Sequence, residues 1–202
     1  MQTVLAGVPV KSFAAAKKRL AAAVPPEVRI ALSQEMARRT CLLLAGTGAR
    51  PLIMASDANV AGWARTQGLE VSLEDGSDLN QAAAATVALA SGQPWLVIHA
   101  DLPLLDSEVL SPLVAAIATG GSVIAPSRDG GTPLVGGSLT NIAFRYGASS
   151  YHRHLRILAA TARVSVVVDR RLAIDLDDPT DLKVVRHRVR WIGEIFDTLG
   201  SS

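Results

Sequence analysis

Apolar residues follow two alternating patterns along the chain. Short, nearly all-apolar runs predict buried β-strands at residues 3–9, 51–56, 70–73, 95–99, 122–126, 134–138 and 164–168. Longer segments with apolar residues at helical spacing predict helices at residues 26–45, 58–67, 80–90, 107–119 and 150–160, and a terminal helix that starts at Pro179. Polar or glycine-containing turns separate these elements, among them residues 11–19, 74–78 and 127–132.

This order of elements predicts a fold class. Strands that alternate with helices of about 10–20 residues require crossover connections. We therefore expect an α/β fold of the Rossmann-like type, with a mainly parallel central sheet and helices on both faces. No internal repeat or linker is visible, so residues 1–202 are expected to form a single domain. In such sheets ligands gather at the carboxyl ends of strands, which makes polar residues just after a strand candidates for a site.

Composition narrows the classes of function. Apolar residues make up 49% of the chain, enough for a buried core, but no apolar run approaches the roughly 20 residues that cross a bilayer. The net charge of +2 and the aromatic content of 4% give little support to nucleic-acid binding. The first residues lack a secretory leader, and the single Cys41 cannot form a disulfide within the chain. We expect a cytoplasmic protein that binds neither membranes nor nucleic acids.

The first candidate segment, residues 8–20, is a basic loop after the first strand. Lys11, Lys17 and Arg19 place positive charge at a strand end, which suits phosphate oxygens. The segment is neither a P-loop nor a dinucleotide-binding glycine motif. Spacing alone favours an ordinary solvated basic turn.

The second candidate is a set of three carboxylates. Asp101 directly follows the most apolar strand, where an uncompensated charge would be unfavourable. Asp175 and Asp177 alternate on extended backbone, so both side chains can point to one side, and like charges there repel unless a cation lies between them. A turn aspartate and a charged loop would also explain these residues. Together, however, the three favour an oxygen-rich site for Mg²⁺ held partly by substrate phosphates.

Two glycine-containing segments form the third candidate. Residues 127–133 predict either a hairpin turn or an anion-binding nest to which Thr132 adds a hydroxyl. Gly147 and Ser150 precede a predicted helix whose N-terminal amides can hold a carboxylate or phosphate. His152 and His154 are two residues apart, the wrong spacing for joint metal binding from one helical face, so a histidine zinc site is not expected.

Taken in order, these motifs resemble a known family. The segments VPVK and AKKRL, LN at 79–80, ADLPLL, PSRDGGT, FRYGASSYHRH and IDLDDPTDL are similar to those of the CofC/FbiD guanylyltransferases of coenzyme F420 biosynthesis, which are related to the MobA-like nucleotidyltransferases. The resemblance covers residues 4–182 and implies a GT-A-like nucleotidyltransferase fold. It also implies transfer of GMP from GTP to 2-phospho-L-lactate, phosphoenolpyruvate or 3-phospho-D-glycerate, with release of pyrophosphate.

The resemblance also implies roles for single residues. Asp101, Asp175 and Asp177 match the Mg²⁺-binding aspartates. The phosphate-binding basic residues correspond to Lys11, Lys17 and Arg19, of which Lys17 and Arg19 are expected to act with Asp101 in catalysis. The acceptor-acid contacts correspond to Thr132, Gly147 and Ser150, and a nucleotide contact to Asn80.

Some positions match the family without a role or depart from it. His154 matches a family histidine for which the sequence indicates no role. Lys18 stands where the family often has threonine, and Pro133 replaces an asparagine after the glycine turn. Because proline lacks a backbone donor, Pro133 bears on the identity of the acceptor. The longer glycine-rich loop of molybdopterin guanylyltransferases is missing, which disfavours that activity.

A phosphate acceptor removes the need for a general base. A phosphate monoester is largely dianionic at neutral pH, because its second pKa is about 6. Positioning and charge neutralisation are then expected to supply the catalysis. The alternatives are another sugar-phosphate or cofactor nucleotidyltransferase, and a non-catalytic nucleotide-binding module. The apolar residues of the terminal helix, including Trp191 and Phe196, can pack either on the core or on a second subunit of a homodimer.

Overall fold

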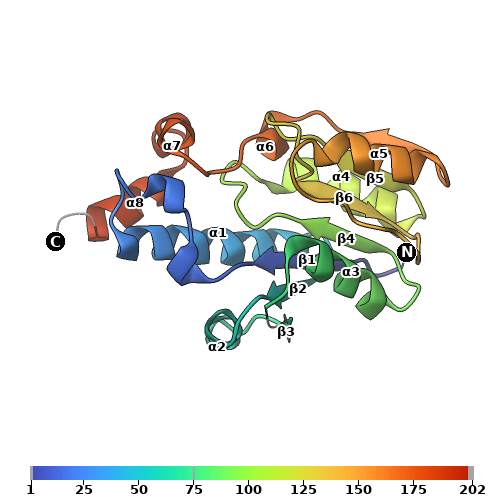
Figure 1. Ribbon diagram of the computed structural model, residues 1–202, viewed down its shortest axis with the longest axis horizontal. Helices are drawn as coiled ribbons and strands as arrows, with labels where there is room; N and C mark the ends of the chain where they lie inside the picture. The colour runs from blue at the N-terminus through green and yellow to red at the C-terminus, as the bar shows by residue number, and fades with distance from the viewer. Residues whose placement is uncertain (1, 75, 200–202) are drawn as a thin grey trace.

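A central β-sheet with helices on both faces organises the molecule (Figure 1). The computed structural model describes residues 2–74 and 76–199, and over these ranges the sheet has seven strands in the order β3-β2-β1-β4-β6-β5-β7. The strands are β1 (Leu5–Val10), β2 (Arg50–Ala55), β3 (Val71–Leu73), β4 (Trp95–Ile98), β5 (Ser122–Ala125), β6 (Leu134–Gly137) and β7 (Val164–Val166). Neighbouring strands are parallel except that β6 runs antiparallel to both β4 and β5. The predicted α/β fold with a mainly parallel sheet is confirmed.

Residues that alternate along the strands feed two cores. The longer helices are α1 (Pro26–Gly46), α2 (Ala58–Thr66), α3 (Leu79–Ala90), α4 (Ser107–Ala118) and α5 (Ser150–Ala159). On β1, Ala6 and Val8 pack into a cluster with residues of α1, α2 and α4, whereas Leu5 packs into a second cluster with residues of α3 and α5. This period of two is the signature of a strand buried on both faces.

The helix α3 lies unusually close to β1. A Cβ atom built on Gly7 of β1 would lie 2.1 Å from Oγ1 of Thr86 on α3. The Thr86 hydroxyl is buried and donates a hydrogen bond to the Ala82 carbonyl within its own helix, 2.9 Å away. Glycine at position 7 therefore allows the helix to approach the strand backbone.

Two parts of the chain differ from the sequence prediction. The single terminal helix is wrong, because the chain forms α7 (Pro179–Arg186) and α8 (Arg190–Leu199). The break allows Val185, Val189 and Ile192 to be buried in one cluster with the first half of α1. A short helix, α6 (Arg170–Ala173), lies where no element was predicted. In the predicted turn at 74–78, residue 75 lies outside the described residues.

The basic loop is also more ordered than a solvated turn. It contains two 3₁₀ helices, η1 (Phe13–Ala15) and η2 (Lys18–Leu20). Phe13 packs edge-to-face on Trp63 at 5.1 Å between ring centroids, and Leu20 is buried in the cluster with α1. These two apolar residues anchor the loop on either side of Lys17.

The terminal helix α8 packs on its own chain. Figure 1 shows it beside α1, and its residues Trp191, Ile195 and Phe196 pack against the third core cluster. Of the two predicted alternatives, packing of the terminal helix on the core is therefore the one observed, and a homodimer stays a prediction. Among the described residues, no helix is both long and apolar enough to span a membrane.

Candidate active site

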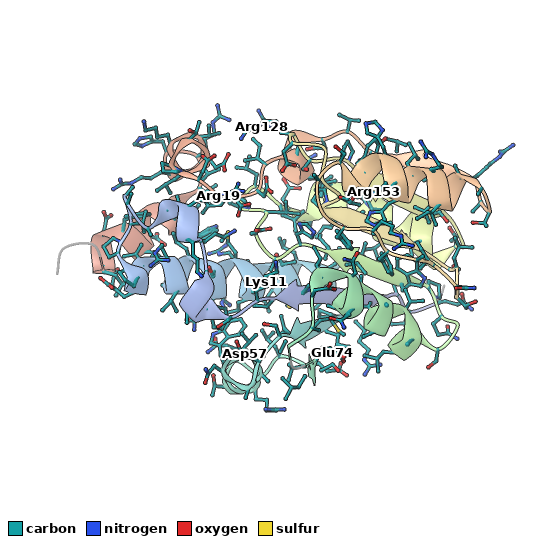
Figure 2. All side chains as sticks on the ribbon, viewed as in Figure 1. Lys11, Arg19, Asp57, Glu74, Arg128 and Arg153 are labelled. Atoms are coloured by element: carbon teal, nitrogen blue, oxygen red, sulfur yellow. The ribbon has the colours of Figure 1, made fainter. Side chains whose placement is uncertain are left out.

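A cleft of about 330 Å³ opens at the carboxyl ends of β1, β2 and β4. The strand β1 lies between β2 and β4, so the strand order reverses direction at this point, where ligands of open α/β sheets bind. Five of the sequence-predicted residues line the cleft: Lys11, Lys17, Asp101, Asp175 and Asp177. Figure 2 shows Lys11 at the centre of the molecule, where β1 ends.

Lys17 links two of the carboxylates. Its Nζ donates to Oδ2 of Asp101 at 2.6 Å and to Oδ1 of Asp177 at 3.0 Å. The lysine side chain is only 7% exposed, against 28% for Asp101 and 44% for Asp177. The backbone of Lys17 is left-handed, with φ of 51° and ψ of 43°, a conformation that is uncommon outside glycine. The contacts of the side chain thus hold the backbone in an unfavourable region.

The charges of this ion pair set the protonation of its members. Burial lowers the pKa of Lys17, but the negative charges of Asp101 and Asp177 outweigh burial and raise the pKa above its ordinary value. Burial likewise raises the pKa of Asp101, and the positive charge of Lys17 outweighs it, so the pKa of this carboxyl is lowered. Both residues are therefore charged at neutral pH.

The pKa of Asp175 shifts in the opposite direction to that of Asp101. Burial, followed by repulsion from Asp101, raises the pKa of Asp175 to about 6. A backbone hydrogen bond of 3.0 Å from the Leu176 N–H to the Asp101 carbonyl brings the segment that carries Asp175 and Asp177 to the cleft. The three carboxylates line one cleft, yet among the described residues no group of three histidine, cysteine or acidic side chains is already assembled as a metal site. The Lys17 ammonium lies between two of them instead.

Asp181 supports this arrangement and was missed by the sequence analysis. It is 3% exposed, and its Oδ2 accepts the backbone N–H groups of Asp177 and Asp178 at 3.1 and 3.0 Å. Its Oδ1 accepts from Arg128 at 2.8 Å, which ties the glycine turn to the start of α7. The DPTD motif was interpreted only as a helix start, although an acidic residue at the third helical position also predicts a capping box.

Thr132, Ser150 and His154 form a buried cluster, and none of the three is among the described residues that line the cleft. The Thr132 and Ser150 hydroxyl oxygens are 3.0 Å apart, and Nδ1 of His154 lies 2.9 Å from the Thr132 oxygen. Each of the two hydroxyl residues is 1% exposed. The structure thus brings together the two segments, residues 127–133 and 145–154, that the sequence analysis grouped as one candidate.

Hydrogen bonds to side chains hold the loop at residues 145–149. Oδ1 of Asn80 accepts the Tyr146 N–H at 2.7 Å, and Arg153 donates to the carbonyls of Arg145 and Ala148 at 3.1 and 2.5 Å. Gly147 has a φ of +117°, which only glycine adopts readily. Asn80, predicted to contact a nucleotide, therefore already uses its oxygen to position this loop.

Arg19 is not brought to the cleft. Among the described residues that line it, Lys11 and Lys17 are present and Arg19 is not. Because η2 directs Leu20 into the core, the neighbouring Arg19 is exposed.

His99 is a cleft residue that the sequence analysis placed only at the end of a strand. Its imidazole lines the cleft, and within the described part of the chain its buried Nε2 has no hydrogen-bond partner. Burial lowers the pKa of His99, which keeps it neutral. Its backbone N–H donates to the Pro133 carbonyl at 2.8 Å. Pro133 lacks an N–H donor, but its carbonyl thus takes part in the hydrogen bonding of the sheet. The sequence signal that could have identified His99 is a polar residue at the end of an apolar strand, close to Asp101.

Comparisons with known proteins show the family and the fold. The family described as "Guanylyl transferase CofC like" matches residues 4–187. A phosphoenolpyruvate guanylyltransferase of Rubrobacter xylanophilus is 34% identical over 89% of this chain and 92% of its own. A 2-phospho-L-lactate guanylyltransferase of Halorubrum lacusprofundi is 33% identical over 82% of this chain and 76% of its own. A crystal structure from Desulfovibrio desulfuricans, described as a nucleotide-diphospho-sugar transferase, shares the fold with a TM-score of 0.78 at 19% identity, covering 98% of this chain and 97% of that one.

Proposed function

The chain belongs to the CofC-like guanylyl transferase family, and from this premise we propose that it transfers GMP from GTP to the phosphate of a phosphorylated three-carbon acid, as a step of coenzyme F420 biosynthesis in the cytoplasm. It is a nucleotidyltransferase. The observation that carries the proposal is the cleft at the strand ends, where Lys17 lies between Asp101 and Asp177 with Asp175 close by.

The donor groups of the cleft fit Mg²⁺. Asp101, Asp175 and Asp177 provide carboxylate oxygens, the ligands that this hard cation prefers when it is shared with phosphates. The pKa of Asp175, raised to about 6, indicates a carboxylate that a nearby cation would stabilise. When bound, Mg²⁺ would supply Lewis-acid stabilisation and orientation of the phosphates.

The protein's own residues position the reaction and neutralise charge. An oxygen of the acceptor phosphate forms a bond to the α-phosphorus of GTP, while the bond from that phosphorus to the bridging oxygen breaks and pyrophosphate leaves. The acceptor is already dianionic, so no side chain has to remove a proton. Lys11 and Lys17 stabilise the phosphate charges from the end of β1 and the loop after it. The contact of Arg19 with phosphate stays a prediction, because Arg19 is not among the described residues that line the cleft.

The acceptor is proposed to lie against residues 130–132 and 147–150. Relatives are named for two acceptors, phosphoenolpyruvate and 2-phospho-L-lactate, which both carry a phosphate and a carboxylate on three carbons. Thr132 lies just before the start of β6, which pairs with the carboxyl end of β4, and its hydroxyl contacts that of Ser150. An anion there would be held by hydroxyl and amide donors.

The test is pyrophosphate release with Mg²⁺ and GTP against 2-phospholactate, phosphoenolpyruvate and 3-phosphoglycerate, with ATP and CTP as controls. We expect turnover with GTP and one acid, and loss of turnover in the Asp101→Asn variant with its fold retained. A folded, active Asp101→Asn protein would contradict the assignment of Asp101. Turnover with CTP or ATP alone would indicate another nucleotidyltransferase, and binding without turnover would indicate a non-catalytic module.

A further inference from the structure

His154 is buried inside the molecule and both nitrogens of its ring have partners. Its exposed fraction is 0%, and its ring lies edge-on to Tyr146 and Phe144, at 4.6 and 5.9 Å between centroids. Nε2 accepts the backbone N–H of Arg145 at 2.8 Å, and Nδ1 lies 2.9 Å from Oγ1 of Thr132. The histidine therefore connects the loop at 145–149 with the glycine turn that ends in Thr132.

These partners leave one protonation state. Because Nε2 accepts an N–H, the ring proton is on Nδ1, and His154 donates to the Thr132 oxygen. Burial, followed by the positive charge of Arg153, lowers the pKa of His154 to about 4, so the ring is neutral at pH 7.

The hydrogen bonds continue from His154 through two hydroxyl groups. The Thr132 oxygen accepts from His154 and shares a further bond of 3.0 Å with Ser150. Two hydroxyl protons are available, and the contact between Thr132 and Ser150 uses one of them. One O–H donor is left over, and it suits an anionic oxygen.

We propose that His154 is a positioning residue of the acceptor site, which donates from Nδ1 to Thr132, accepts at Nε2 from Arg145 and so holds the loop at 145–149 against the glycine turn. The inference rests on the proposed function, since these two segments are the proposed binding place of the acid. His154 itself acts through Thr132 and Arg145 and does not contact the substrate.

Three variants separate the two hydrogen bonds. In His154→Gln the side-chain oxygen can still accept from Arg145, in His154→Asn the amide can still donate to Thr132, and His154→Phe keeps a ring but loses both bonds. We expect kcat/KM for the acceptor acid to fall about 10- to 100-fold in His154→Phe through a higher KM for the acid, with the KM for GTP within twofold. Each amide variant should recover part of this loss. The matched control is His152→Phe, at an exposed position two residues away on the same helix, and it should leave both KM values unchanged.

A purely structural histidine would behave differently. It would lower the thermal midpoint and the amount of active enzyme while leaving both KM values as they were, and that result would overturn the proposal.

Two measurements on the protein without substrates keep the inference separate from the proposed function. Nitrogen NMR of the histidine rings should show the Nδ1–H form for His154 at pH 7, and the Nε2–H form would overturn the proposal. Amide hydrogen exchange in His154→Phe should accelerate at residues 127–132 and 145–150 and stay unchanged in α2. Unchanged exchange in both segments would also overturn it, even if no acid in the panel were turned over.

Discussion

Lys17 is held in a left-handed backbone conformation by what its side chain contacts. For a residue other than glycine this conformation is unfavourable by about 1–2 kcal/mol. The ammonium group compensates by pairing with Asp101 and Asp177, which would otherwise repel one another across the cleft. Strain of this kind gathers at functional sites.

Replacing Lys17 tests this balance. Lys17→Met leaves two neighbouring carboxylates without their cation, so we expect a loss of about 1–3 kcal/mol in the metal-free protein, moderated by the solvent that reaches both aspartates. On the proposed function, Mg²⁺ should restore part of the loss, and turnover should fall by at least about 100-fold. Thermal unfolding with EDTA or Mg²⁺ measures the first effect. Lys18→Met, at an exposed neighbouring position, is the control, and equal effects of the two variants would show that the ion pair is not responsible.

Asp175 gives a prediction about pH. The pKa of its carboxyl is about 6 in the folded protein, against an ordinary value of 3.8, so folding favours the protonated form. The stability that this group contributes is complete below about pH 3.8 and is lost as the pH rises through about 6. In EDTA at pH 7.5, Asp175→Asn should therefore be more stable than the parent by about 1 kcal/mol after allowance for solvent contact, or about 2–4 °C.

At pH 4.5 the difference between Asp175→Asn and the parent protein should largely vanish, because the parent carboxyl is then protonated. The variant should be inactive at both pH values. A variant that is less stable than the parent at pH 7.5 would show that Asp175 makes a favourable contact in its charged form.

At the level of single residues, the sequence predicted part of the site. A carboxylate after an apolar strand made Asp101 a candidate, because ligands of such sheets gather at strand ends. For Lys11 and Lys17 spacing alone favoured a solvated turn, and only the family resemblance implied a role at the site. The direction of Arg19 depends on η2, and the place of Asp177 depends on the bond between Leu176 and Asp101, far apart in sequence. No local sequence pattern predicts a hydrogen bond between residues that are so far apart in the chain. His99 and Asp181 could have been found from local signals, as a polar strand end and a capping-box acid.

Among the elements, β1 and α3 are coupled through Gly7 and Thr86. Gly7→Ala would place a methyl group where the Thr86 hydroxyl now lies, and overpacking of this kind costs about 1–3 kcal/mol. Adding Thr86→Ala removes the two nearest colliding groups, the hydroxyl and the methyl, and leaves only the Cβ of residue 86 at 2.9 Å, so the double variant should be more stable than the sum of the single effects. Urea unfolding of all four proteins measures the coupling. Strictly additive effects would contradict the close approach of helix and strand.

Element types were more predictable than their pairing. Strands appeared as short apolar runs and helices as apolar residues with a period of three to four, and these elements are confirmed apart from their ends and the terminal helix. The antiparallel course of β6 depends on its contacts with β4 and β5, to which a short apolar run gives no clue. The break between α7 and α8 likewise depends on the burial of Val189 and Ile192 against α1, because the local sequence alone is compatible with one helix.

On the scale of the whole molecule, the third core cluster lies under the candidate site. It joins α1, α7 and α8 and includes Leu176, a fully buried residue between two of the cleft carboxylates. Leu176→Ala should cost about 2–5 kcal/mol and, on the proposed function, raise the Mg²⁺ concentration needed for half-maximal rate. Leu110→Ala, equally buried but on α4 in another cluster, should lose similar stability without that change. Assays at a temperature where both variants are folded, with metal titrations, compare them. Equal metal requirements would contradict a link between this cluster and the site.

The antiparallel strand β6 divides the sheet into two blocks that are also continuous in sequence. The strands β1 to β4 carry the lysines and Asp101, whereas β5, β6 and β7, with α5, carry the glycine turn and the loop around Gly147. On the proposed function, one block faces the nucleotide and the other the acid. A graft of residues 121–168 from a relative that prefers a different acid would then exchange acceptor choice as a unit. Substitutions in the block of β5, β6 and β7 would thus change acceptor preference during evolution, while nucleotide binding by the block of β1 to β4 is left intact.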